Sequence, residues 1–181
     1  MNFKEVVEAI KAAVPDAVES VDETKRDPFA VIKKDKLEQV ARFLRDDPRL
    51  DYDHLSLISA VDYLKPPAIE VVYHLDSLTK NHPFVFKVKL PRNDPKLPTL
   101  CRVWATADWH ERESFDLMGV IFEGHPNLVR ILCAEDWVGF PLRKDYEWPK
   151  EYHGIPCGPF AKQGVNIPPE WEVEGFTTVK E

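Results

Sequence analysis

The sequence predicts an α+β fold: an antiparallel-rich sheet with helices packed on one face, followed by an extended irregular C-terminal tail. Residues 69–75 and 84–90 predict the sheet, because apolar and polar side chains alternate there as in strands buried on one side. Residues 2–14 and 37–44 predict helices, because apolar residues recur at helical spacing. Residues 119–181 predict the tail, since they hold seven glycines and seven prolines and show no sustained periodicity.

Three helices are expected. The first covers residues 2–14 and ends at Pro15. The second follows Asp35, which forms a capping-box arrangement with Glu38. The third is expected to begin with Thr99 as its N-cap and to end before Gly119. Their apolar stripes are Phe3, Val6, Val7, Ile10 and Val14, then Leu37, Val40, Ala41 and Leu44, and finally Leu100, Val103, Trp104, Ala107, Phe115 and Met118.

The expected strands comprise two short segments and three longer ones. In order along the chain they are residues 17–21, 29–32, 54–63, 69–75 and 84–90. Short connections join the three longer strands, so we expect an antiparallel meander. Its face away from the core is expected to carry Glu70, His74, Lys87 and Lys89.

Charge and hydropathy exclude several classes of protein. The net charge of −7 argues against a nucleic-acid partner and against adsorption to an anionic membrane surface. No apolar run approaches the roughly 18 residues of a membrane span. The N-terminus has too little continuous apolar length for a signal peptide. We therefore expect a cytosolic protein, or one held on the cytosolic face of a larger assembly.

The cysteines and glycines argue against a bound cofactor. Cys101, Cys133 and Cys157 are odd in number and widely spaced, so they are expected to be free thiols and not ligands of an iron–sulfur cluster. All glycines fall at or after Gly119 and never cluster as a phosphate-binding loop. The chain alone is therefore expected to bind no nucleotide and no redox cofactor.

The same distribution of glycine predicts a division by role. Residues 1–121 are expected to form the α+β domain, and residues 122–181 an extended segment that docks on partners. Trp137, Trp148 and Trp171 lie in that segment. Burial of these side chains against a neighbouring chain would offset the entropy lost when the segment becomes ordered.

Residues 109–146 combine charged side chains with aromatic residues and glycines, and three interpretations compete. A metal site is disfavoured because an incipient HExxH pattern has Ser114 in place of its second histidine. Acid–base catalysis by Glu111, Glu113 or Asp116 is disfavoured because no nucleophile accompanies them and nearby cations would neutralise them. A structural and docking network is the strongest interpretation.

Glu111 is the observation that favours such a network. Helical spacing places this carboxylate on the apolar stripe of the third helix, where it needs a cationic or hydrogen-bonding partner. Arg130 and Arg143 are the candidates from outside the helix. Arg112 and Asp116, four residues apart, are expected to pair along the helix surface.

Three blocks of this stretch, WHERESFDLMG, FEGHPNLVRIL and DWVGFPLRKDY, occur in the order of a known signature. They resemble the 30-kilodalton subunit family of the proton-pumping NADH:quinone oxidoreductase, respiratory complex I. The resemblance implies a hydrophilic core subunit of the peripheral arm, without catalysis of its own. It also implies a peripheral location on the cytoplasmic side of the bacterial inner membrane.

The resemblance further implies partners and cofactors. The chain is expected to dock beside the quinone-site subunit and the subunit that holds the terminal iron–sulfur cluster. Iron–sulfur clusters, FMN and quinone are expected to belong to partner subunits. No catalytic, cofactor-binding or metal-binding residue is implied in this chain. The signature positions carry over as structural or interface residues: Glu111, Arg112, Glu113, Asp116, Gly119, His125, Pro126, Arg130, Asp136, Trp137, Pro141, Leu142, Arg143, Lys144, Asp145 and Tyr146.

Two alternatives stay open. The first is the equivalent subunit of a membrane-bound hydrogenase or of a ferredoxin-dependent relative, which the complete RKDY run disfavours. The second, from another class, is a stand-alone enzyme that uses the carboxylates of Glu111 and Asp116.

Overall fold

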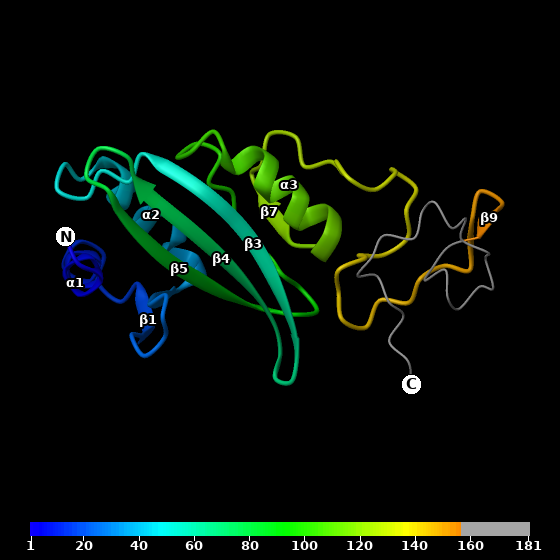
Figure 1. Cartoon of the computed structure of the whole chain (residues 1–181), viewed down its shortest axis with the longest axis horizontal. Helices are drawn as coiled ribbons and strands as arrows, with labels where there is room; N and C mark the ends of the chain where they lie inside the picture. Colours follow the sequence, from blue (N-terminus) through cyan, green and yellow to red (C-terminus); the bar gives the residue numbers. More distant parts are fainter. Residues whose placement is uncertain (157–181) are drawn as a thin grey trace, which may run out of the picture. The chain divides into compact units, whose positions relative to one another are not determined.

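The computed structural model describes residues 1–156, so Cys157 and Trp171 lie outside the described residues. The chain divides into two compact units, Met1–Lys144 and Asp145–Glu181. The first unit contains the main sheet and the helices (Figure 1). Among residues 1–156, no helix combines the length and the apolar character needed to cross a membrane.

Five strands form the main sheet: β1 (Val18–Asp22), β2 (Phe29–Ile32), β3 (His54–Leu64), β4 (Pro67–Ser77) and β5 (His82–Pro91). Their order across the sheet is β1-β2-β5-β4-β3. β3, β4 and β5 form the predicted antiparallel meander, and β1 pairs antiparallel with β2. Within this sheet, only the junction between β2 and β5 is parallel. The predicted antiparallel-rich sheet is therefore confirmed.

The α-helices of the described residues, α1 (Phe3–Ala13), α2 (Leu37–Asp46) and α3 (Ala107–Met118), pack on one face of this sheet (Figure 1). Asn2 caps α1, because its side chain accepts the N–H of Glu5 while the Glu5 carboxylate accepts the N–H of Asn2. The apolar stripes predicted for α1 and α2 are buried against the sheet, except that Phe3 is only partly buried. The predicted α+β class is confirmed.

The core lies between these helices and the alternating face of β4 and β5. The ring of Tyr73 stacks on that of Phe86 with centroids 4.6 Å apart, and Phe3 of α1 stacks on Phe84 at 5.5 Å. Burial of each large apolar side chain contributes roughly 1.5–3 kcal/mol, so this face fixes where the helices sit. The alternating residues of the two strands are all buried, as predicted: Ile69, Val71, Tyr73, Leu75, Phe84, Phe86, Val88 and Leu90.

Two predicted helix starts are wrong. Asp35 lies inside a short 3-10 turn, η1 (Lys34–Lys36), and α2 follows it without a side-chain cap. Thr99 does not cap α3, which begins only at Ala107. The preceding residues instead form β6 (Lys96–Pro98), which pairs in parallel with β7 (Ile121–Glu123), and the Thr99 hydroxyl is bonded to Glu111. The chain therefore makes a turn before the helix starts.

The observed division of the chain lies after Lys144, and not after residue 121 as expected. The intervening residues stay with the first unit because several of their N–H groups bond to buried carboxylates of that unit. In the second unit, β8 (Glu151–Tyr152) and β9 (Ile155–Pro156) form a short antiparallel hairpin. The docking role expected for residues 122–181 stays a prediction.

Candidate functional site

Asp116, on α3, is a fully buried carboxylate that binds several donors of the predicted charged network. Its Oδ1 accepts a bond from Arg130 Nη1 at 2.6 Å. Its Oδ2 accepts the backbone N–H groups of Ile131, Leu132 and Cys133 at 3.0, 2.7 and 2.8 Å. Burial alone would raise the pKa of Asp116, but these donors outweigh it and lower the pKa to about 2. Asp116 is thus an anion that fixes the following loop on α3.

Arg130 binds carbonyl groups as well as this carboxylate. Its guanidinium donates to the carbonyl oxygens of Asp116, Trp137 and Gly139 at 2.9, 3.0 and 3.0 Å. The planar fork of N–H donors on an arginine suits several acceptors at once. Arg130 therefore connects α3 to the loop at Trp137 and Gly139.

Arg112 does not pair with Asp116, so that prediction is wrong. Its Nε donates to the carbonyl oxygen of Val129 at 3.2 Å, and its guanidinium lies 5.0 Å from the centroid of the Trp109 ring. The i,i+4 spacing allowed a pair along the helix surface, but Asp116 is fully buried and bonded to the loop. The side chains of Trp109 and Val129 remain exposed.

The C-terminal end of α3 is closed by Gly119 and Arg143. Gly119 has a left-handed φ of 72°, which is common for the glycine that follows a helix. Arg143 Nε donates to the carbonyl oxygen of Met118 at 2.8 Å, and its guanidinium lies 4.8 Å from the centroid of the Phe140 ring. The block that contains Arg143 therefore folds back on the end of the helix.

Asp62, on β3, is a buried residue of the same kind that sequence reasoning missed. It pairs with the guanidinium of Arg92 at 2.6 Å and accepts the N–H of Lys144 at 2.9 Å. The bond from Arg92, helped by that N–H group, lowers the pKa of Asp62. The available sequence signal was alternation, because Asp62 follows the buried Ile58 by four residues and so lies on the same, core-facing side of β3.

Glu111 is fully buried, as predicted, but the arginines expected to pair with it lie elsewhere. Arg130 is bonded to Asp116, and Arg143 to the carbonyl oxygen of Met118. Both arginines donate to groups near the C-terminal end of α3, where the loop folds back, whereas Glu111 lies more than one helical turn earlier. The predicted pair between Glu111 and an arginine is therefore wrong.

The donors to Glu111 come from the turn that precedes α3. Its Oε1 accepts the N–H of Leu100 at 2.7 Å, and its Oε2 accepts the Thr99 hydroxyl at 2.5 Å and the Cys101 thiol at 3.5 Å. Burial raises the pKa of Glu111 to about 7, against the lowering effect of these bonds. Glu111 therefore anchors the turn to the helix and, unlike Asp116, titrates near neutral pH.

The structure also brings together Cys101, Glu111 and His125, with one ligand-type atom from each within 4.8 Å of the others. The orientation of the His125 ring does not suit a metal. Its Nδ1 accepts the N–H of Asn127 at 3.0 Å, so the neutral ring carries its proton on Nε2, which lies 3.2 Å from the carbonyl oxygen of Asp108. A metal would need a lone pair on that nitrogen and a proton on Nδ1. The expected lack of a metal or redox cofactor stays a prediction.

The remaining signature residues are spread over the loop and the second unit. Glu113 is exposed on α3, and Lys144 uses its backbone N–H to bind Asp62. Asp145 and Tyr146 belong to the second unit. The other positions lie in the loop that follows β7: Pro126, Asp136, Trp137, Pro141 and Leu142.

Asp62, Glu111 and Asp116 together form what we call the anchor set, the buried carboxylates that bind backbone N–H groups of irregular segments. For Asp62 and Asp116, whose pKa values are lowered, the acceptor is charged, and such bonds are about twice as strong as bonds between neutral groups. None of the three carboxylates is open to a substrate, because all are buried and held by donors. The arrangement positions the chain and does not resemble an acid–base pair.

Comparisons with known proteins show which family this chain is similar to. The family model described as "Respiratory-chain NADH dehydrogenase, 30 Kd subunit" matches residues 30–152. The NADH-quinone oxidoreductase subunit designated C of Chloroherpeton thalassium is 44% identical over 81% of this chain and 61% of that protein. The protein of the same name from Chlorobium phaeobacteroides is 41% identical over 82% of this chain and 90% of that protein. The protein of the same name from Roseiflexus sp. is 46% identical over 77% of this chain and 81% of that protein.

Solved structures share the fold. The trypsin-resistant fragment (1-134) of Nqo5 is 29% identical and superimposes with a TM-score of 0.56, covering 69% of this chain and 98% of that chain. A chain of the membrane-bound sulfane sulfur reductase, an archaeal respiratory membrane complex, superimposes with a TM-score of 0.69 over 97% of this chain and 98% of that chain. At 23% identity, the second likeness shows the fold alone. Because the family model matches more than half of the chain, from β2 through the anchored loop, the chain belongs to the 30 kDa subunit family of respiratory-chain NADH dehydrogenase.

Proposed function

We propose that the chain is a non-catalytic hydrophilic core subunit of the peripheral arm of a proton-translocating NADH:quinone oxidoreductase. It docks beside the quinone-site subunit and the subunit that holds the terminal iron–sulfur cluster, and so supports electron transfer from NADH to quinone. Iron–sulfur clusters, FMN and quinone belong to the partner subunits. The chain is held peripherally on the cytoplasmic side of the bacterial inner membrane, and its contact with the membrane is through the assembly.

The observation that carries this proposal is the fixed but irregular loop after β7. Residues 124–144 contain no helix or strand, yet Asp116, Arg130 and Arg143 hold them on α3. The same loop leaves large apolar side chains in solvent, with Leu132, Val138 and Leu142 exposed by 63%, 80% and 57%. Apolar side chains on a rigid support are typical of the core of a protein interface.

The chemistry of the anchor set supports a role without catalysis. A general acid or base must reach the proton that it moves, and Glu111 and Asp116 are both buried and bonded to their own chain. This weighs against the stand-alone enzyme. The names of the curated relatives favour the NADH–quinone assembly over the hydrogenase-type alternative.

Purification of the tagged chain from its native membrane tests the proposal. We expect NADH-oxidising, iron–sulfur and quinone-site subunits to co-purify and to be identified by mass spectrometry. The double variant Leu132→Asp/Val138→Asp should reduce their recovery. Leu78→Asp, at an equally exposed apolar residue in the turn after β4, is the control and should not. Hydrogenase subunits in place of NADH-oxidising ones would support the alternative, and a chain that purifies alone would contradict both.

A further inference from the structure

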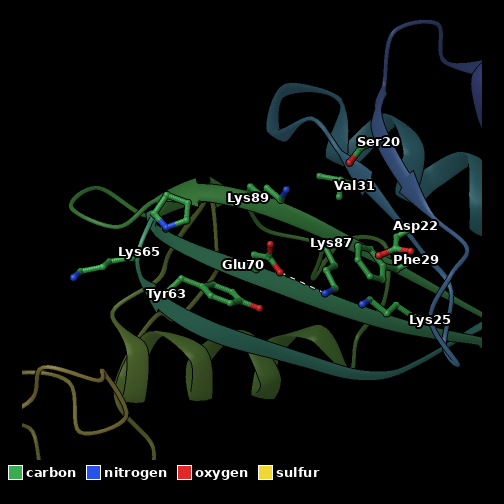
Figure 2. A pocket seen from close by; sticks show the side chains of 12 residues that line it. Ser20, Asp22, Lys25, Phe29, Val31, Tyr63, Lys65, Glu70, Lys87 and Lys89 are labelled. Carbon is green, nitrogen blue, oxygen red and sulfur yellow. Dashed lines mark hydrogen bonds and ion pairs between the residues drawn. The ribbon is translucent and has the colours of Figure 1, made fainter.

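The face of the sheet opposite the helices carries a hollow of about 620 Å³. It extends from β1 across β2, β5 and β4 to the turn between β3 and β4, as Figure 2 shows. Glu70, Lys87 and Lys89 project into it from the polar side of the alternating strands. The sequence pattern predicted this polar face but assigned no role to it. The anchor set lies on the other face of the sheet, the one that the helices cover.

Positive charge gathers in this hollow although the whole chain has a net charge of −7. Four lysines line it, Lys25, Lys65, Lys87 and Lys89, against two carboxylates. Lys87 forms an ion pair with Glu70, with Nζ 3.4 Å from Oε2. Within the described part of the chain, the other three lysines form no ion pair. The lysines outnumber the two carboxylates of the hollow, Asp22 and Glu70, so this surface gains stability when an anion arrives.

The walls of the hollow are partly aromatic. Lys87 Nζ lies 3.8 Å from the centroid of the Phe29 ring, and Tyr63 lines the opposite end at 37% exposure. Lys144 Nζ also lies 5.8 Å from the centroid of the Tyr63 ring, although Lys144 itself does not line the hollow. Ammonium groups beside aromatic surface fit a ligand that carries both carboxylates and apolar side chains, as a polypeptide segment does.

A protein segment fits better than a nucleic acid. A nucleic acid carries phosphates along its whole length, well beyond the hollow, and the chain as a whole has a net charge of −7. Small-molecule sites enclose most of their ligand, whereas the rim residues Lys65 and Lys89 are exposed here. We propose that this lysine-lined hollow docks an extended acidic segment of another subunit of the assembly. The inference rests on the proposed function and names a second surface, separate from the loop after β7.

Carbodiimide coupling of the purified assembly tests this chemistry directly, because the reagent joins lysine amines to carboxylates that touch them. Mass spectrometry should find Lys65 and Lys89 joined to Asp or Glu residues of one segment of another subunit, and 0.5 M salt should reduce this coupling. Lys87 and Glu70 should couple to each other in every sample, which confirms that the reagent has reached the hollow.

A charge-reversal pair adds a quantitative readout. Lys65→Glu/Lys89→Glu should weaken association of the chain with the assembly by about fivefold to tenfold, as expected for two exposed ion pairs. Lys11→Glu/Lys34→Glu changes the net charge equally at exposed residues of α1 and η1 and should have little effect.

The outcomes separate the two proposals. An intact assembly in which Lys65 and Lys89 couple to no other subunit overturns the docked segment and leaves the proposed function standing. Coupling only to acidic residues of this chain's own C-terminus, such as Glu170, Glu172 and Glu174, also overturns it. If the chain co-purifies with no assembly, both proposals fail together.

Discussion

Gly119 lies so close to Phe140 that a Cβ on the glycine would be 2.5 Å from Cε2 of the ring. Its φ of 72° is also one that L side chains rarely adopt. Gly119→Ala should therefore combine about 1 kcal/mol of backbone strain with about 1–3 kcal/mol of overpacking. Urea-induced unfolding of the full-length chain measures the sum.

Gly124→Ala is the matched control for Gly119→Ala. Gly124 has a similar φ of 81°, but its added Cβ would meet only Thr99 Cγ2, at an ordinary 3.6 Å. It should show the strain without the overpacking. In a Phe140→Ala background, the added effect of Gly119→Ala should fall to that of Gly124→Ala. Equal effects of the two alanine substitutions in the native background would show that the Phe140 ring moves aside freely.

Asp116→Asn should be among the most damaging substitutions in the chain. It removes the charge that pairs with Arg130 at 2.6 Å and weakens the bonds to the following loop. A broken buried pair typically costs about 3–5 kcal/mol, because the remaining charge is left without a partner. Thermal unfolding followed by circular dichroism measures the loss. Glu113→Gln, an exposed residue on the same helix, should stay within about 0.5 kcal/mol of the native chain.

Glu111 should make the stability of the chain depend on pH near neutrality. Its folded pKa of about 7 lies above the ordinary value of 4.5, so the folded state keeps a proton that the unfolded state has lost. The free energy of unfolding should therefore fall as the pH rises from about 4.5 to 7, by an amount on the order of 3 kcal/mol. Urea titrations at several pH values should show this slope in the native chain and in Glu113→Gln, but not in Glu111→Gln. An unchanged slope in Glu111→Gln would assign it to other groups.

The folded unit should end at Lys144. A chain that stops there keeps the donors to Asp116 and the N–H that Lys144 gives to Asp62. A chain that stops at Phe122 loses both, and leaves two buried carboxylates with fewer partners. Circular dichroism should show cooperative melting of the longer chain and aggregation or a broad transition for the shorter one. Cooperative melting of the shorter chain would restore the boundary expected from the sequence after residue 121.

The sheet could be predicted from the sequence because its pattern is local. One-sided burial forces the alternation seen at Ile69 and Val71, and no distant contact is needed to recognise it. The starts of α2 and α3 were missed because Asp35 and Thr99 have the chemistry of helix caps but are used otherwise. Residue type indicated a cap, and tertiary contacts decided the conformation.

The members of the charged network could be recognised from the sequence, but not their pairing. Glu111 and Asp116 were identified as structural residues, yet the arginine partners expected for each were wrong. Pairing depends on where an irregular loop returns to the helix, and residues after Gly119 have no period from which that path follows. Asp62 went unnoticed for a related reason, since Arg92 and Lys144 reach it only through the fold.

The anchor set has a consequence for which substitutions the family can accept. A backbone N–H is the same group in nearly every residue, so a carboxylate that binds it places no demand on the side chain. Proline alone lacks that group. The chain can therefore vary in residue type at the anchored positions over evolutionary time and still keep its loops in place, with proline as the one excluded choice. These positions are Ile131, Leu132, Cys133 and Lys144. Leu100 is anchored in the same way, but its buried side chain must also pack in the core.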